Sequence, residues 1–372
     1  MKLQTRHPLL KFENEQDKLT DSLSAAVFVG DNLWVASDET TSVERLSTDD
    51  GLTFQHHKSF PLERLLNLPA HGTEFDQEID IEGMAYLDSY LWLIGSHSGK
   101  RKKVGKNDQG SDAKLIGKLA KSELDGNRFL LARVPLVING ETGEQELRSP
   151  VEVPPGSGHI LQASRLPGDT RSDALTDALR QAEGGQGDLH LASFLNLPGK
   201  DNGLDIEGLA VTSEKVFVGL RGPALRGWAV ILELSVSTSD PSRLMLNNFE
   251  ANGRPYRKHF LDLDGLGIRE LCVNGADLLV LAGPTMNLDG PTTLYRWRNA
   301  LNATEETLVR GERLARELEI PFGAATDHAE GIALIPDEQP PLRLLVVYDS
   351  PSSQRKEGTG AVRADIFELP AN

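Results

Sequence analysis

The chain has 372 residues and a formal net charge of −16, from 39 Lys and Arg against 55 Asp and Glu. This acidic balance excludes a general binder of nucleic acid or of anionic membranes, because both need a basic excess. The single cysteine, Cys272, excludes an intrachain disulfide framework and a cysteine-based metal cluster.

The N-terminal stretch, MKLQTRHPLLKFENEQD, has no apolar core of the kind found in a signal peptide. No stretch approaches the roughly 18 apolar residues that a spanning helix needs. Together with the lone cysteine, these features predict a reducing, cytoplasmic setting and no membrane partner.

Apolar runs joined by short polar turns recur along the chain, and the first pair covers residues 24–38. This stretch, SAAVFVGDNLWVASD, has a Gly-Asp-Asn turn between two apolar runs, which is typical of a buried β-hairpin. Residues 82–96, EGMAYLDSYLWLIGS, align with it without a gap and place Trp92 over Trp34.

The pattern changes after this second copy. Residues 102–114 are interpreted as a polar, glycine-containing loop, and residues 128–136 predict a further strand. Residues 172–185 have helical spacing and end in glycines, so we expect a helical insertion near 165–187. Loop and helical insertions are expected within about 103–190.

The hairpin returns three times in the second half of the chain. Residues 207–221 and 269–283 align with the earlier copies without gaps, and residues 330–349 need a longer turn. Further strands are predicted at 228–234 and 292–298.

A unit of about four strands that recurs every ~60 residues is typical of a β-propeller. We therefore predict an all-β fold, with one propeller domain over residues 1–372 and five blades visible in the sequence. The gap between the second and third copies is about twice that between the later ones, so six blades are the alternative.

The alignment also predicts which side chains meet. The first residue of each copy starts one strand and the last ends its antiparallel partner, so both lie at the same edge of the sheet. In a propeller these edges converge on one mouth of the central channel. The first positions are Ser24, Glu82, Glu207, Arg269 and Glu330, and the last are Asp38, Ser96, Arg221, Gly283 and Asp349. His328 lies just upstream of the fifth copy, and His97 follows the second.

Carboxylates that face one axis repel each other unless a cation lies among them. Calcium or magnesium suits oxygen ligands better than zinc does. We therefore expect a divalent-ion site formed by Glu82, Glu207, Glu330 and Asp38. There are two alternatives. Arg221 and Arg269 pair with the glutamates, or each Glu-Gly pair locks neighbouring blades through backbone N–H donors.

Residues 95–103, GSHSGKRKK, combine small residues with cations. They form either an anion-binding loop that uses Ser96 and Lys100 or a solvated charged loop. No Walker loop, dinucleotide fingerprint, zinc-protease helix or nucleophile elbow occurs in the sequence, so no nucleotide cofactor is expected. We expect an anionic small molecule as the partner, and the sequence leaves the oligomeric state open.

The stretch KDNGLDIEGLA followed by GLRGPALRGWAVILEL, with GSHSGKRKK and NRFLLARVPL, resembles the bacterial family described as domain of unknown function 3616. The matching motifs span most of the chain, and the family implies no established activity. More distantly, the Glu-Gly hairpins resemble those of the esterase-like phytase, gluconolactonase and strictosidine-synthase propellers. Those families imply a site at a channel mouth, often with a divalent ion, and hydrolysis of lactones or phosphoesters.

Two function classes follow. In the first, the chain is a metal-assisted hydrolase of an ester, lactone or phosphoester. Asp349 is then a catalytic candidate that assists at the ion, and His97 or His328 moves protons. An anionic group is held by Arg221, Arg269, Ser96 and Lys100. In the second, the chain is a non-catalytic module whose mouth binds an anionic small molecule or a peptide.

Overall fold

The repeated apolar runs form the strands of five mainly antiparallel sheets, the blades of a β-propeller. The computed structural model describes residues 5–13, 17–70, 78–105, 108–286, 288–336 and 341–369. Blade 1 consists of β3 (Leu23–Val29), β4 (Asn32–Ser37), β5 (Ser42–Thr48) and β6 (Thr53–Pro61). Blade 2 consists of β7 (Ile81–Leu87), β8 (Tyr90–Gly95), β11 (Leu131–Ile138) and β12 (Gln145–Leu147), with β15 (Ser164–Arg165) beside β11.

The other three blades come from the second half of the chain and its ends. Blade 3 consists of β16 (Asp205–Val211), β17 (Val216–Gly222), β18 (Trp228–Leu234), β21 (Tyr256–Asp262) and β25 (Thr307–Val309). Blade 4 consists of β22 (Gly267–Asn274), β23 (Asp277–Gly283), β24 (Thr292–Trp297) and β26 (Leu314–Ile320). Blade 5 consists of β27 (His328–Leu334), β28 (Arg343–Asp349), β30 (Asp365–Glu368) and β1 (Thr5–Arg6).

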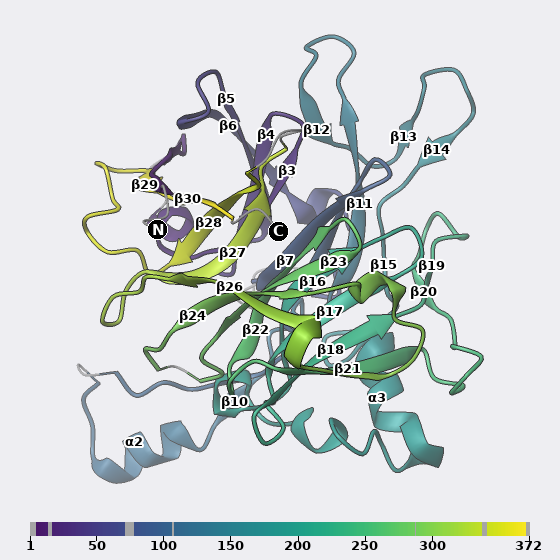
Figure 1. Ribbon diagram of the computed structural model, residues 1–372, viewed down its shortest axis with the longest axis vertical. Coiled ribbons are helices and arrows are strands. Elements are labelled where there is room, and N and C mark those ends of the chain that lie inside the picture. The colour runs from purple at the N-terminus through teal and green to yellow at the C-terminus, as the bar shows by residue number, and fades with distance from the viewer. Residues whose placement is uncertain are drawn as a thin grey trace.

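The first strands of the five blades form a closed ring. The strand β3 contacts β7 and β27, β16 contacts β7 and β22, and β22 contacts β27. Figure 1 shows these inner strands around the middle of the molecule. The chain ends join the ring, because β1 pairs with β30, and β2 (Leu9–Lys11) lies between β29 (Ala361–Arg363) and β6. This arrangement confirms the predicted five-bladed propeller.

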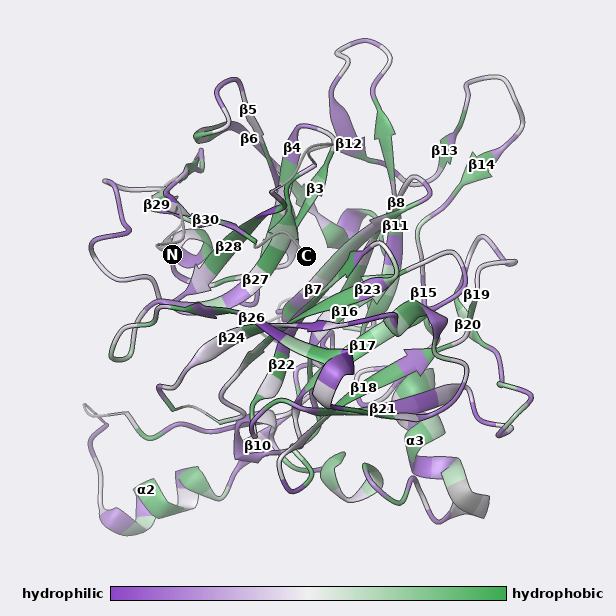
Figure 2. Ribbon diagram, viewed as in Figure 1, coloured by the Kyte–Doolittle hydropathy of each residue, from purple (hydrophilic) through white to green (hydrophobic). Residues whose placement is uncertain are grey.

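The hydrophobic core lies between the blades. Five clusters of buried side chains alternate with the sheets, and each is shared by two neighbouring blades. The aligned tryptophans repeat this arrangement: Trp34 packs between blades 1 and 2, and Trp92 between blades 2 and 3. Strands near the middle are mostly hydrophobic in Figure 2, and the peripheral loops carry more hydrophilic residues.

The long gap between the second and third hairpins holds insertions, and no sixth blade is formed there by the residues that the structure describes. The predicted helix is α3 (Ala174–Gly185), whose N-cap Asp173 accepts a hydrogen bond from the Thr176 N–H. The expected loop at 102–114 is partly wrong, because α2 (Asp112–Leu119) begins inside it. We call residues 99–125 the arm; in it, β9 (Lys100–Arg101) pairs with β10 (Ser122–Glu123).

The remaining elements are short and lie in the connections. They are α1 (Asp17–Asp21), β13 (Val151–Glu152), β14 (Ile160–Leu161), β19 (Val236–Ser237), β20 (Met245–Leu246), η1 (Leu62–Arg64), η2 (Ala192–Phe194), η3 (Gly199–Asp201), η4 (Ala300–Asn302) and η5 (Gly311–Arg313). Among the described residues, no helix combines the length and the apolar character needed to cross a membrane.

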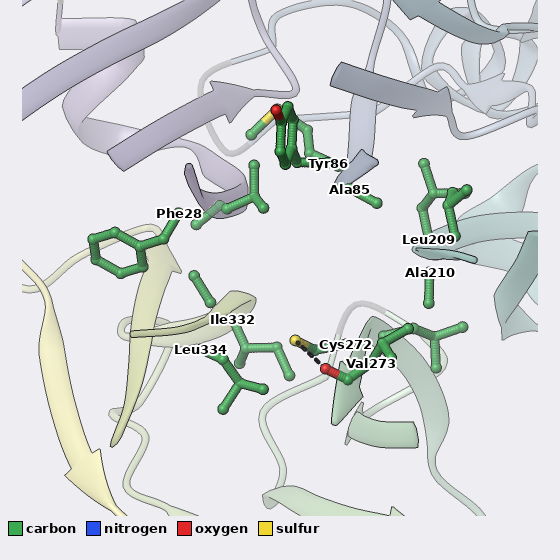
Figure 3. A pocket seen from close by; sticks show the side chains of 15 residues that line it. Phe28, Ala85, Tyr86, Leu209, Ala210, Cys272, Val273, Ile332 and Leu334 are labelled. Carbon is green, nitrogen blue, oxygen red and sulfur yellow. Dashed lines mark hydrogen bonds between the residues drawn. The ribbon is translucent and has the colours of Figure 1, made fainter. Parts of the chain in front are cut away.

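The far ends of the inner strands enclose an apolar cavity of about 200 Å³ (Figure 3). Each of the five inner strands contributes three consecutive residues to its lining. Small side chains occupy one equivalent position in four of the blades, at Ala85, Ala210, Cys272 and Ala333. These small residues leave space at this end of the channel.

Candidate functional site

Every inner strand has a β-bulge near its start. In each blade the register skips one residue of the inner strand, and these residues are the first positions of the aligned copies: Ser24, Glu82, Glu207, Arg269 and Glu330. In blade 3 the register also skips Arg221 on the partner strand β17. A bulged residue has no partner across the ladder, and the bulge changes the direction of its side chain. The local backbone therefore directs Glu82, Glu207 and Glu330 into one cavity at the mouth.

The glycine of each Glu-Gly pair allows neighbouring blades to approach closely. A Cβ on Gly83 would lie 2.8 Å from the Cβ of Leu209 on the next inner strand. A Cβ on Gly208 would lie 2.9 Å from Leu271, again across a blade boundary. The repeated pair thus combines two functions, because the glutamate points into the mouth and the glycine closes the ring.

Blade 4 has Glu270 where blades 2, 3 and 5 have this glycine. Its carboxyl accepts hydrogen bonds from the backbone N–H groups of Leu209 (3.1 Å) and Leu271 (2.8 Å). Burial raises the pKa of Glu270 well above its usual range. The interblade lock expected of the Glu-Gly glutamates is therefore made here by Glu270, which the sequence pattern did not single out.

The mouth contains a cavity of about 520 Å³, and carboxylates from blades 1, 2, 3 and 5 line it. On one side, ligand oxygens of Asp38, Asp80 and Glu82 all lie within 4.8 Å of one another. We call these three residues the carboxylate side. The Oδ1 atom of Asp38 is buried and has no hydrogen-bond partner among the described residues. The structure thus brings Asp38 and Glu82 together as expected and adds Asp80.

On the other side, two arginines neutralise the remaining glutamates. Arg221 Nη1 lies 2.6 Å from Glu207 Oε1, and the same guanidinium contacts Asp205. Arg269 Nη1 lies 2.7 Å from Glu330 Oε1 and 3.1 Å from Glu207 Oε2. We call Glu207, Glu330, Arg221 and Arg269 the arginine side. Glu207 and Glu330 thus have cationic partners already, unlike the expected arrangement in which they hold an ion.

Burial dominates the electrostatics of the mouth. It raises the pKa of Asp38 to about 7, and the neighbouring Asp80 and Asp349 carboxylates act in the same direction. Burial, followed by repulsion from Asp80, raises the pKa of Glu82 well above its usual range. The pKa of Glu330 is also raised well above its usual range, first by burial and then by Asp349. Without a further cation, Asp38 therefore tends to retain its proton near neutral pH.

Arg128 is a site residue that the sequence pattern missed. It precedes β11, and its guanidinium contacts both carboxylate oxygens of Asp80, at 2.6 and 2.7 Å. It also donates to the hydroxyl of Ser96 (3.2 Å). Ser96 is therefore buried behind Arg128 and is absent from the residues that line the cavity.

Lys100 lines the cavity as expected, but its charge is already compensated. Its ammonium contacts Glu78 and lies 3.4 Å from Asp125. The 95–103 loop therefore combines features of both interpretations, because it reaches the mouth and yet its Lys100 is paired with acidic neighbours.

The two candidate histidines lie in different places. His97 is buried, with Nδ1 2.7 Å from the Gly95 carbonyl and Nε2 2.9 Å from Asp173 Oδ2. Since both partners are acceptors, the ring carries protons on both nitrogens. Its backbone has a left-handed φ of 53°, and His97 joins blade 2 to α3. It does not line the mouth cavity.

His328 lies beside the mouth. Its Nε2 is 3.3 Å from Asp289 Oδ1, and its Nδ1 is 3.9 Å from Asp349 Oδ2. These two carboxylates, Asp349 foremost, raise the pKa of His328. His328 lines a side chamber that shares Arg221, Glu330, Asp349 and Lys200 with the main cavity. Of the two histidines, His328 is the one that reaches the mouth region.

Solved structures that align with nearly the whole chain have low sequence identity and low TM-scores. A glutaminyl cyclase from Myxococcus xanthus is 10% identical, with 99% of both chains covered and a TM-score of 0.39. The calcium-binding protein regucalcin from Agrobacterium tumefaciens is 12% identical, with 97% of this chain and 95% of that chain covered and a TM-score of 0.35. Values this low carry no argument about activity, and no curated protein sequence matches the chain.

The family comparison is decisive for membership. The family described as "Protein of unknown function (DUF3616)" matches residues 22–365. This range contains all five bulged positions and both sides of the mouth. The chain therefore belongs to the DUF3616 family.

Proposed function

We propose that the chain is a divalent-cation-dependent hydrolase that acts on an anionic ester, lactone or phosphoester at the polar mouth. The observation that carries the proposal is the carboxylate side. Its three acidic side chains converge within 4.8 Å, and the buried Oδ1 atom of Asp38 has no hydrogen-bond partner among the described residues. An uncompensated buried oxygen beside two further carboxylates is favourable only with a proton or a cation.

The donor set fits calcium or magnesium. Asp38, Asp80 and Glu82 offer only oxygen atoms, which hard cations prefer, and no imidazole or thiolate belongs to this group. A cation there would replace the protons that the raised pKa values favour and would relieve the repulsion among the carboxylates. When bound, a divalent ion polarises an ester or phosphoryl oxygen and lowers the pKa of a bound water.

The chain's own residues would supply positioning and proton transfer. Arg128 fixes the orientation of Asp80 through contacts to both of its carboxylate oxygens. His328, between Asp289 and Asp349, has a raised pKa and therefore carries a proton over a wider pH range than an isolated histidine. Such a histidine is suited to protonate a leaving group. Arg221 and Arg269 keep positive charge next to the cavity.

The second candidate function is binding without turnover, and the position of the histidines favours it. His97 is enclosed by Gly95 and Asp173, and His328 lines the side chamber, so neither ring belongs to the carboxylate side. If neither imidazole reaches the ion, the mouth binds an anionic small molecule through the cation and releases it unchanged.

The test begins with calorimetric titration of EDTA-treated protein with calcium chloride and with magnesium chloride. We expect binding of at least one ion in the wild type, and a loss of affinity of about tenfold or more in Asp38→Asn and Glu82→Gln. Glu39→Gln is the matched control, because Glu39 lines the same cavity outside the three-residue group. Equal affinities in all four proteins would contradict the proposal.

Turnover separates the two candidates. Wild-type protein with the ion that binds is assayed against nitrophenyl esters, lactones and phosphomonoesters, with and without EDTA. Ion-dependent release of product supports the hydrolase. Ion binding together with ligand-induced thermal shifts, but without product, supports the binding module.

A further inference from the structure

Nearly every cation that lines the mouth cavity is already paired with a carboxylate. The pairs join Arg128 to Asp80, Arg221 to Glu207, Lys100 to Glu78, Arg101 to Asp201 and Lys102 to Glu123. An incoming anion would have to compete with these internal carboxylates for the same N–H donors. These five side chains are therefore poor candidates for binding the charged group of a ligand.

Two lining cations differ from the rest. The side chains of Lys200 and Lys103 form no hydrogen bond and no ion pair with any residue that the structure describes, although both line the cavity. Lys200 also lines the side chamber, next to His328 and Arg269. Lys200 thus lies at the junction of the two spaces without a direct ion-pair contact among the described residues, although its charge acts to lower the pKa values of Asp38, Glu207 and Asp349. Lys103 lies on the arm, which forms another wall of the cavity.

The backbone holds Lys200 firmly over the mouth. It lies in η3, and the neighbouring Gly199 donates to the Gly99 carbonyl of the arm (3.0 Å). A Cβ on Gly199 would lie 2.4 Å from Asp205 Oδ2, so this segment passes directly over the carboxylate that pairs with Arg221. The turn then closes with Asn202 in a left-handed conformation (φ 63°). An exposed ammonium on such a fixed backbone loses little backbone freedom when a ligand binds.

The charge distribution of the cavity is therefore divided. One part of its lining is the carboxylate side. Lys200 and Lys103 supply the positive charge that has no direct ion-pair contact among the described residues. Val104 and Leu119 of the arm add a short apolar stretch to the lining. A cavity of about 520 Å³ is within the usual size of small-molecule sites. The ligand that fits is a small molecule with one group for the cation and a separate anionic group.

We propose that Lys200 determines specificity at this site by binding the phosphate or carboxylate group of the ligand, with Lys103 as its partner on the arm. The inference deepens the proposed function, since it names the part of the anionic substrate that lies away from the cation. The anion contact itself requires only Lys200 and the cavity.

The test uses inorganic phosphate as the probe, titrated calorimetrically into full-length protein with magnesium chloride at constant ionic strength. We expect Lys200→Gln to weaken phosphate binding by about tenfold or more, because a charge-assisted hydrogen bond is lost. Lys103→Gln should have a smaller effect in the same direction. Lys200→Arg should retain affinity within about threefold.

Lys102→Gln is the matched control, because it removes the same charge from the same cavity but from a lysine paired with Glu123. Its phosphate affinity should stay within about twofold of the wild type. Equal losses in Lys102→Gln and Lys200→Gln would indicate general electrostatics and would overturn the inference. Unchanged phosphate binding in Lys200→Gln would also overturn it.

Calcium titration of the same variants separates this inference from the proposed function. Removal of a positive charge beside Asp38 should leave calcium affinity unchanged or slightly increased in Lys200→Gln. If no divalent ion binds the wild type while phosphate binding still depends on Lys200, the proposed function fails and the anion contact stands. If calcium binds normally but phosphate binding ignores Lys200, the reverse holds.

Discussion

The same five inner strands form two very different ends of the channel. At one end the bulged residues place Glu82, Glu207, Arg269 and Glu330 around the mouth. At the other end, after a few residues of regular pairing, the lining is apolar, with Phe28, Tyr86 and Leu334 among its side chains (Figure 3). The five inner strands run in the same direction and belong to the same ring. The difference in polarity between the two ends therefore comes from the bulges and from the residue types at each end.

Charged side chains in this fold are tolerated at the bulged positions of the inner strands. A bulged residue leaves the ladder without disturbing the pairing beyond it, so a charged side chain there reaches the cavity. At the apolar end, Cys272 is on a regularly paired stretch, and burial raises its pKa to about 12. The thiol therefore stays protonated there, whereas carboxylates at the mouth share their charge with arginines or one another.

The largest expected effect is at the arginine side. Glu207→Leu removes the carboxylate that contacts both Arg221 and Arg269, and leaves buried guanidinium charge without its partner. We expect the free energy of unfolding to fall by about 3 kcal/mol or more, as measured by urea denaturation. Glu39→Gln, at an exposed residue of the same mouth, should change it little. A similar loss in both variants would contradict the division of the mouth into two sides.

The buried contacts of His97 with Gly95 and Asp173 should give the next largest effect. His97→Gln removes the charged ring between Gly95 and Asp173, and we expect a loss of about 2 kcal/mol in unfolding free energy with little change in calcium affinity. Because the His97 pKa is raised in the folded state, its stabilisation is present at low pH and is lost as pH rises through that pKa. A variant that folds normally but loses all turnover would instead support the catalytic role predicted from sequence.

The carboxylate side should make cation binding depend on pH. Burial raises the Asp38 pKa from 3.8 to about 7, so below pH 7 an ion must displace a proton. Calcium affinity should fall as pH drops below 7, by about tenfold per unit for each proton displaced, and protons on Asp80 and Glu82 would steepen the fall. Calorimetry in buffers with different ionisation enthalpies measures the released proton. An affinity that is flat between pH 5.5 and 8 would contradict the raised pKa.

The same shift has a defined sign for the ion-free protein. Between about pH 4 and pH 7 the folded chain keeps the Asp38 proton that the unfolded chain has lost, so this group lowers stability as pH rises. Calcium should reverse the trend near pH 7. Thermal unfolding at pH 5 and pH 7, with calcium and with EDTA, checks both signs.

The smallest effect is expected at the apolar end. Cys272→Ala keeps a small side chain at a position where other blades have Ala85, Ala210 and Ala333, so unfolding free energy should change by about 1 kcal/mol or less. Calcium affinity should not change. In the wild type, the raised pKa predicts thiol labelling at pH 7 that is slower than for an exposed cysteine by roughly a thousandfold.

The repeat could be predicted from the sequence because the recurring Glu-Gly pair coincides with the β-bulge at the start of an inner strand. The alignment placed residues 24, 82, 207, 269 and 330 at equivalent positions, and in the structure each is the bulged residue of its blade. The meeting of Glu82, Glu207 and Glu330 at one mouth follows from the closed ring. The first and last strands of each hairpin are buried and periodic, and such patterns survive in a single sequence.

Other parts were hidden for physical reasons. Arg128 and Asp80 are far apart in sequence, and a single sequence contains no pattern that predicts such a long-range ion pair. His97 was predicted to reach the mouth, but its left-handed backbone turns it toward α3. The helix α2 is short, none of its residues is buried, and it lies in a polar stretch that contains glycines, so its sequence is typical of a loop. Lys200 lies in a short turn whose position depends on the fold of the arm.

The five bulges give this chain an unusual freedom to change its chemistry. The residues before and after each bulged residue are paired with the neighbouring strand, but the bulged residue itself is not. Cross-strand pairing therefore does not restrict which side chain can occupy the bulged position. Ser24 shows the extent of that freedom, since the same slot holds a hydroxyl that donates to the Ile81 carbonyl instead of a carboxylate. Substitutions at the bulged positions that do face the mouth, such as Glu82, can therefore change its charge while the cross-strand pairing of the propeller stays in place.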